Sequence, residues 1–169
     1  MLIRSITFNM LNQLLLLTDL MSLVSGCSCE GISQEPKDKY CGSDFAALAK
    51  IMTVGAVEDD KIMYMFSAEK VYKDTKQLIG GIPIALASTS SREEDCGLPN
   101  LQNNTQYLLN GSVKHLAREL PFKYLELTSC TALSAQKWDD IPDDIRRAVE
   151  DRTYEPCSKM GIMSRALKF

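Results

Sequence analysis

Six cysteines constrain this chain more than any other feature, because all of them lie within residues 27–157. An even number of cysteines in a chain of this length is typical of a disulfide framework in an exported protein. The alternative is a structural zinc site, but such sites usually take ligands from CxxC or HxxxH pairs, and the sequence contains neither. We therefore expect three disulfides, whose pairing the cysteine spacing alone leaves open. The six residues are Cys27, Cys29, Cys41, Cys96, Cys130 and Cys157.

The segment before the first cysteine has the features of an export signal. Arg4 provides a positive start, an apolar stretch is centred on Leu14–Leu17, and small residues end it. The stretch is interrupted by Asp19 and is too short to span a bilayer, which needs about 20 consecutive apolar residues. We expect residues 1–26 to be a signal peptide removed after Gly26, which implies a secreted product without membrane insertion.

The composition narrows the choice of partners and domains. The formal net charge is −3, with 45% hydrophobic and 24% charged residues, as in an ordinary globular protein. A chain without excess positive charge gives no reason to expect nucleic acid or an acidic membrane as partner. The length suits one domain, which we place at residues 27–157 and expect to be monomeric, followed by a short tail at 158–169.

Alternating hydrophobic and polar residues predict a β protein. The alternation is clearest from Ile62 through Tyr64 and Phe66 and continues to Tyr72, which is the period-two pattern of a half-buried strand. Five predicted strands without intervening helices favour a small antiparallel barrel or sandwich. The other four strands are expected at Phe45–Val54, Ile82–Ala87, Tyr107–Val113 and Phe122–Leu127, although periodicity alone would also allow a helix at Phe45–Val54.

The tail of the domain changes to a helical period. Ile141, Ile145 and Val149 fall on one face of a predicted amphipathic helix, which Pro156 is expected to end. The segment Cys27–Cys41 is polar and is expected to be irregular, with at most a short helical turn.

Four short motifs carry a resemblance to a known family. The chain after cleavage would begin Cys27-Ser28-Cys29, and Cys41–Asp44 reads Cys-x-Ser-Asp before the first predicted strand. Lys70–Lys73 reads Lys-x-Tyr-Lys, and Asp95–Gly97 places a cysteine before glycine. In order and spacing this pattern resembles the tissue inhibitors of metalloproteinases, and the resemblance covers residues 27–157.

The resemblance implies a fold and a disulfide pairing. The family's amino-terminal domain is a netrin-like module, a mainly β fold in which a five-stranded OB-fold-like antiparallel barrel has flanking helices. The implied disulfides are Cys27–Cys96, Cys29–Cys130 and Cys41–Cys157. The family commonly carries a second domain with six more cysteines, so we expect residues 27–157 to be the inhibitory domain alone.

The resemblance also implies an inhibitor of matrix metalloproteinases or related metzincins that acts outside the cell, in the extracellular matrix. The amine and carbonyl of Cys27 would chelate the zinc of the protease, and Ser28 would enter its specificity pocket. The chain would need no cofactor of its own. Glu30 and Glu94-Asp95 are charged where the family is mostly uncharged, which bears on target range. The implied protease contacts are Cys27, Ser28, Cys29, Glu30, Glu94, Asp95, Cys96 and Gly97.

Two other classes of function are alternatives to inhibition. A non-inhibitory netrin-like module that binds matrix or signalling proteins shares the barrel and the cysteines. A hydrolase is disfavoured, because the sequence has a single histidine, His115, and contains no HExxH or GxSxG motif. Asn103 and Asn110 each begin a glycosylation sequon, so the sequence predicts N-glycosylation at one or both of them.

Overall fold

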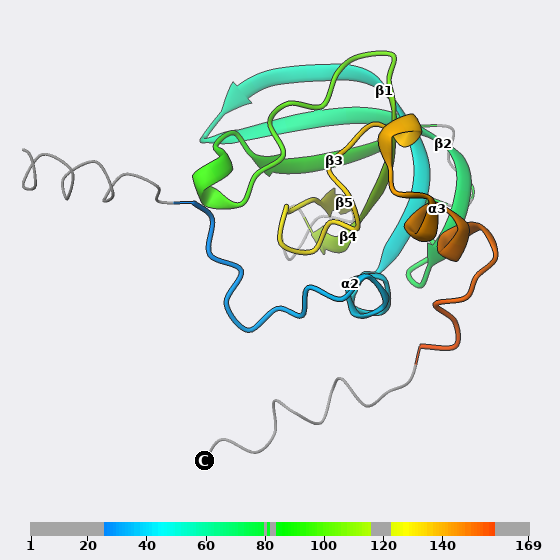
Figure 1. Cartoon of the computed structure of the whole chain (residues 1–169). Helices are drawn as coiled ribbons and strands as arrows, with labels where there is room; N and C mark the ends of the chain where they lie inside the picture. Colours follow the sequence, from blue (N-terminus) through cyan, green and yellow to red (C-terminus); the bar gives the residue numbers. More distant parts are fainter. Residues whose placement is uncertain (1–25, 80, 82–83, 116–122, 158–169) are drawn as a thin grey trace, which may run out of the picture.

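The computed structural model describes residues 26–79, 81, 84–115 and 123–157. Most of the predicted signal peptide and the predicted tail at 158–169 lie outside these residues. Within the described ranges, no helix is both long and apolar enough to cross a membrane. Figure 1 shows the elements, which are α2 (Pro36–Gly42), β1 (Phe45–Glu58), β2 (Lys61–Asp74), β3 (Ala85–Ser90), η1 (Glu93–Asp95), β4 (Gln106–His115), β5 (Lys123–Glu126), η2 (Trp138–Asp140) and α3 (Asp143–Glu150).

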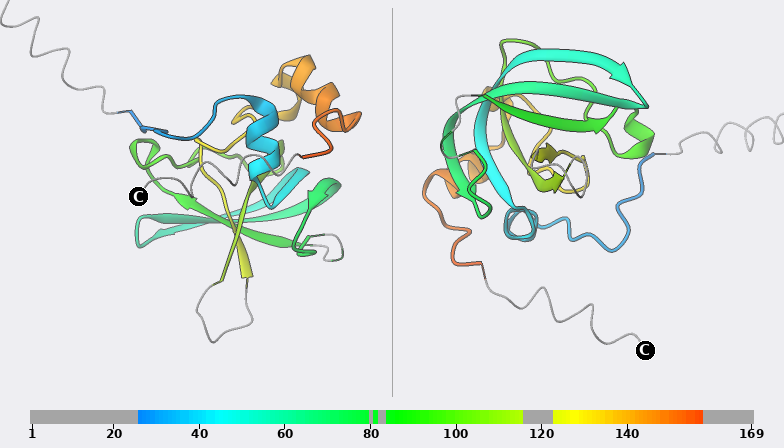
Figure 2. Two further views of the ribbon diagram at one scale, coloured as in Figure 1. Left: turned by 90° about the horizontal axis from the view of Figure 1, so that it is seen from below. Right: turned by 180° about the vertical axis from the view of Figure 1, so that it is seen from behind.

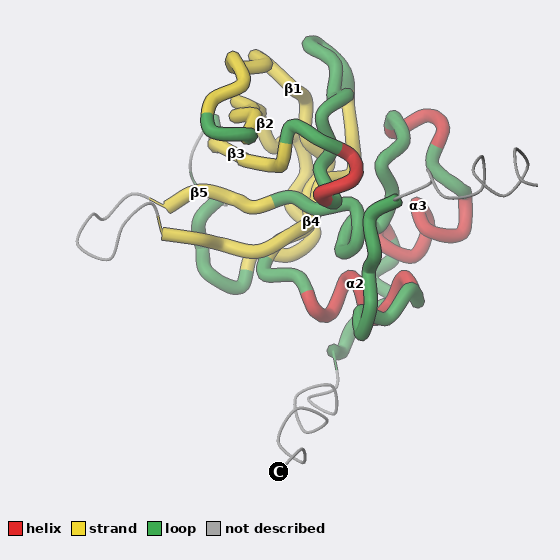
Figure 3. The backbone as a smooth tube through the Cα atoms, turned by 90° about the vertical axis from the view of Figure 1, so that its left-hand side faces the viewer, coloured by secondary structure: helices red, strands yellow, loops and turns green. Residues whose placement is uncertain are grey.

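The five strands form a closed barrel in the order β1-β2-β3-β5-β4. The predicted fold class, a mainly β barrel with flanking helices and three disulfides, is confirmed. Four of the strand contacts are antiparallel, whereas β3 and β5 run parallel where Ala87 pairs with Leu125. Figures 2 and 3 show that α2 and α3 lie on one side of the strands.

The first half of β1 is buried on both faces. Phe45, Ala47 and Ala49 point into the barrel, while Ala46 and Leu48 belong to a second apolar cluster outside it. Residues of α2 and α3 pack in the same outer cluster, so Ala46 is fully buried and Leu48 half-buried on that face. This two-sided burial explains why the sequence there is a continuous apolar run rather than an alternating one.

Strand β2 changes face along its length. Ile62, Tyr64 and Phe66 point into the barrel, as the alternation predicts, but Tyr72 packs in the outer cluster. Between Phe66 and Tyr72 the register with β1 shifts twice, so that Glu69 and Tyr72 have no paired residue in β1. Such a shift moves the following side chains relative to the sheet faces. The prediction that Tyr72 continues the inward series was therefore wrong.

The helices also differ from the sequence-based expectations. The predicted irregular segment contains α2, a seven-residue helix that begins at Pro36, where a first turn tolerates proline. Helix α3 ends at Glu150 rather than at Pro156. Arg152 adopts a φ of 56°, and the Thr153 N–H donates to the Ala148 carbonyl at 3.0 Å. This is the hydrogen bond of a Schellman-type helix end, here without the usual glycine.

Two buried tyrosines in the outer cluster are expected to respond differently when their hydroxyl groups are removed. Tyr40 Oη donates to Glu155 Oε1 at 2.8 Å, whereas Tyr72 Oη is buried and has no hydrogen-bond partner among the described residues. Burial raises the pKa of Tyr72 to about 12, so its hydroxyl stays neutral near pH 7. We expect Tyr40→Phe to destabilise the domain by about 1–2 kcal/mol and Tyr72→Phe to be neutral or slightly stabilising. Urea midpoints in the reverse order would contradict this description of the cluster.

Candidate functional site

The three disulfides join the amino-terminal segment to distant parts of the chain. The structure pairs Cys27 with Cys96, Cys29 with Cys130 and Cys41 with Cys157, at Cα–Cα distances of 5.0, 5.3 and 5.4 Å. These are the same three pairs that the resemblance implies. Cys96 directly follows η1 and Cys130 lies in the turn after β5, so the first two disulfides attach the chain start to two loops at one end of the barrel.

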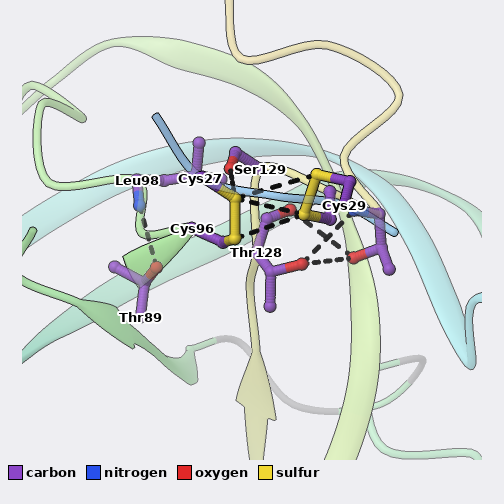
Figure 4. Close-up of a disulfide and its surroundings, with 9 residues drawn as sticks. Cys27, Cys29, Thr89, Cys96, Leu98, Thr128 and Ser129 are labelled. Atoms are coloured by element: carbon purple, nitrogen blue, oxygen red, sulfur yellow. Dashed lines mark hydrogen bonds between the residues drawn. A yellow bond between two sulfur atoms is a disulfide. The ribbon is translucent and has the colours of Figure 1, made fainter. Parts of the chain in front are cut away.

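The two disulfides of the CxC motif lie against each other, as Figure 4 shows. Cys130 Sγ is 3.3 Å from both Cys27 Sγ and Cys96 Sγ, and all four sulfur atoms lie within 4.8 Å of one another. Such a cluster would suit a metal if the cysteines were thiolates. Because all four are oxidised to disulfides, the cluster instead fixes Cys27 and Cys29 in position.

Side-chain exposure alternates along the attached segment. Cys27 and Cys29 are half-buried, whereas Ser28 and Glu30 are exposed. The Ile32 N–H donates to the Cys29 carbonyl at 3.2 Å, which turns the chain immediately after the motif. Ser28 is therefore a projecting side chain held between two anchored neighbours.

The second segment of the site is η1 with the two residues after it. The Cys96 N–H donates to the Glu93 carbonyl at 3.0 Å, and the Ser129 N–H donates to the Cys96 carbonyl at 2.9 Å. Gly97 is buried, and a Cβ atom there would lie 2.1 Å from the Ser90 carbonyl oxygen. Only glycine allows this close approach, so Gly97 determines how the chain after η1 packs against the end of β3.

The acidic residues of η1 are exposed and only partly neutralised. Arg92 Nε lies 2.8 Å from Asp95 Oδ2 and 4.0 Å from Glu94 Oε1, and Arg92 also reaches Asp60 at the β1–β2 turn at 3.7 Å. These ion pairs are solvent-exposed, so we expect each to contribute little to stability. Their effect is local, because they hold the carboxylates of η1 beside the β1–β2 turn.

The structure thus brings all eight residues expected from the sequence to one end of the barrel. We call the two segments, residues 27–30 and 94–97, the amino-terminal ridge; the Cys27–Cys96 disulfide joins them. Sequence reasoning missed two supporting residues, Arg92 and Ser129. A single cation before three acids was a detectable signal for Arg92, whereas nothing local in the sequence marks Ser129.

The two glycosylation sequons have very different surroundings. Asn110 is 2% exposed, and its amide nitrogen donates to Ser43 Oγ at 2.7 Å and to the Thr131 carbonyl at 2.8 Å. Its Oδ1 accepts from the Leu133 N–H at 2.8 Å, so the whole amide is engaged. A glycan at Asn110 is incompatible with this packing, and that prediction is wrong for the folded domain. Asn103 lies in an exposed turn, where a glycan stays a prediction.

Comparison with known proteins agrees with this architecture. None of the curated proteins matches the chain significantly. The family model described as tissue inhibitor of metalloproteinase matches residues 25–164, well over half of the chain. The matched range contains all six cysteines and both segments of the amino-terminal ridge. The chain therefore belongs to the tissue inhibitor of metalloproteinase family.

Proposed function

We propose that the mature chain is a secreted inhibitor that chelates the active-site zinc of metalloproteinases through the amine and carbonyl of Cys27. Family membership supports the coarser statement, that the chain is a metalloproteinase inhibitor rather than an enzyme. The observation that carries the finer one is the attachment of Cys27 and Cys29 by two adjacent disulfides, with Ser28 exposed between them. Three disulfides are also typical of extracellular proteins.

The chemistry of the target explains why a chain terminus is needed. A metalloproteinase holds zinc with three protein ligands and leaves the fourth position to water. A terminal residue offers an amine and a carbonyl oxygen on one α-carbon, and together they close a five-membered chelate ring. An amide nitrogen is a poor donor, so the mechanism requires cleavage after Gly26. Because a terminal amine has a pKa of about 7.7–8.0, releasing its proton near pH 7 costs little.

The disulfides address the entropy of binding. A free chain end loses conformational freedom when it is fixed in a protease cleft, and that loss weakens binding. Here each cysteine of the CxC motif is already bonded to a loop of the barrel. The segment is ordered before the protease arrives, so binding to zinc requires little further ordering.

Replacing Ser28 should affect binding without affecting folding. The side chain is exposed in the free domain. We propose that it becomes buried in the protease pocket that binds the substrate side chain following the cleaved bond. Ser28→Gly is expected to weaken inhibition about tenfold, equivalent to about 1.4 kcal/mol, with an unchanged melting temperature. Ser28→Thr keeps the hydroxyl and is the matched control, expected to inhibit like the native protein. Equal inhibition constants for Ser28→Gly and native protein across several sensitive proteases would refute this role.

An inhibition panel with authentically processed protein tests the proposal as a whole. Its targets are matrix metalloproteinases and related metzincins, and mass spectrometry should first establish that the secreted product begins at Cys27. Inhibition of at least one of these enzymes is expected. A correctly folded product that begins at Cys27 and inhibits none would favour the non-inhibitory binding module, which family membership does not favour.

A further inference from the structure

A cavity beside Cys27 has no part in the proposed chelation. Its volume is about 920 Å³, and its walls come from η1, the loop between η1 and β4, and the segment around η2. Gly26 and Cys27 both border it. When Gly26 is removed, the new amine of Cys27 therefore lies at the edge of this cavity, which we call the amine-side pocket.

The floor of the amine-side pocket is formed before any ligand binds. Tyr64 Oη donates to the Leu98 carbonyl at 2.9 Å. The Leu98 N–H donates to Thr89 Oγ1 at 2.9 Å, as Figure 4 shows. The Gln102 N–H donates to Tyr107 Oη at 3.1 Å. Leu98 and Tyr107 are both buried, so barrel side chains hold the loop and give the pocket a fixed, largely apolar base.

The rim of the pocket is acidic. Glu93, Glu94 and Asp140 contribute three carboxylates, and Lys137 contributes one ammonium group. Glu93 and Asp140 come from different elements, η1 and η2, and both residues are exposed. An apolar base under a negatively charged rim suits a ligand that has an apolar stem and a positive end.

We propose that the amine-side pocket receives a lysine or arginine side chain of the bound metalloproteinase. This inference rests on the proposed function, which places the catalytic zinc at the Cys27 amine and hence at the pocket mouth. If Ser28 occupies the protease pocket for the side chain that follows the cleaved bond, the amine of Cys27 faces the other half of the cleft. That half binds the substrate residues before the cleaved bond. The basic side chain therefore comes from the rim of that half of the cleft, and the pocket selects among proteases by the charge of this rim.

The pocket can be tested without any protease. We expect 2-phenylethylammonium to shift the backbone NMR signals of residues 98–102 and 136–137, and 3-phenylpropionate, an anion of similar size, to leave them unchanged. Glu93→Gln/Asp140→Asn should weaken binding of the cation at least fivefold. Glu58→Gln/Asp151→Asn removes two exposed acids that do not line the pocket and is the matched control, expected to bind like native protein. Equal binding of both probes, or by both double variants, would overturn the ligand assignment.

A second measurement tests the occupant. Against a sensitive metalloproteinase with a lysine or arginine on that rim, Glu93→Gln/Asp140→Asn should raise the inhibition constant about tenfold. Against the same protease with that residue replaced by glutamine, the native protein and the double variant should inhibit equally. A double variant that binds the cation weakly yet inhibits both proteases like native protein would overturn the assignment of a protease side chain to the pocket.

The two measurements separate this inference from the proposed function. The NMR titration needs neither zinc nor a free amine, so its expected result holds even for protein acetylated on Cys27. Absence of inhibition by processed native protein would reject both the chelation and the protease side chain as occupant, while selective cation binding would still establish the pocket. Inhibition by native protein without selective cation binding would reject the pocket alone.

Discussion

One alanine added before Cys27 is expected to weaken inhibition of a sensitive metalloproteinase at least about a thousandfold, equivalent to about 4 kcal/mol. The extension converts the amine into an amide and places a peptide group where the zinc-bound water was. Acetylation removes the same donor with less bulk and should have a similar effect. The measurement compares inhibition constants of native, acetylated and alanine-extended protein against one protease.

The extension should leave the domain folded. The barrel core and the three disulfides do not include the amine, so melting temperature and disulfide map are expected to match those of the native protein. This control separates loss of a metal ligand from loss of structure. An alanine-extended form that inhibits as well as native protein would show that Cys27 does not bind zinc through its amine.

Gly97→Ala should have the largest effect on stability and should impair inhibition as well. The added Cβ would lie 2.1 Å from the Ser90 carbonyl oxygen and 2.7 Å from that of Arg92, and neither backbone atom can rotate away. Either the β3–η1 connection or η1 itself must move, and η1 is followed directly by Cys96, the disulfide partner of Cys27. We expect a loss of about 3 kcal/mol, the upper end of the usual range for an overpacked site.

Gly42→Ala is the matched control for this substitution. Gly42 is the last residue of α2, and a Cβ atom there meets nothing within 4 Å. The alanine should be neutral or slightly stabilising, because it reduces the freedom of the unfolded chain. Thermal unfolding of both variants, with inhibition measured well below their melting temperatures, checks the pair. Equal stability of the two variants would show that Gly97 does not set the path of the chain.

The architecture was largely predictable from the sequence, because the six cysteines and the strand patterns are local signals. The contacts that escaped prediction depend on tertiary structure. Tyr72 changes face because register shifts with β1 interrupt the alternation, and Arg152 ends α3 in a conformation usually left to glycine. Asn110 is buried and bonded to Ser43, far away in the sequence, so its sequon alone does not reveal that the amide is engaged.

The candidate site shows the same division. Its disulfide-bonded residues were expected from the CxC motif and the family resemblance, because the spacing of cysteines can be read directly from the sequence. The amine-side pocket was not expected, because its walls come from η1, the following loop and η2, which meet only in the folded barrel. Neither Glu93 nor Asp140 belongs to a recognisable motif, so proximity alone reveals their shared position on the rim.

A crystal structure of the processed protein bound to a zinc metalloproteinase tests the central claim most directly. The account predicts that the Cys27 nitrogen and carbonyl oxygen both lie about 2.0–2.2 Å from the catalytic zinc, replacing its water, with Ser28 directed into the neighbouring pocket. A complex in which the zinc keeps its water and Cys27 contacts only protein atoms would contradict it.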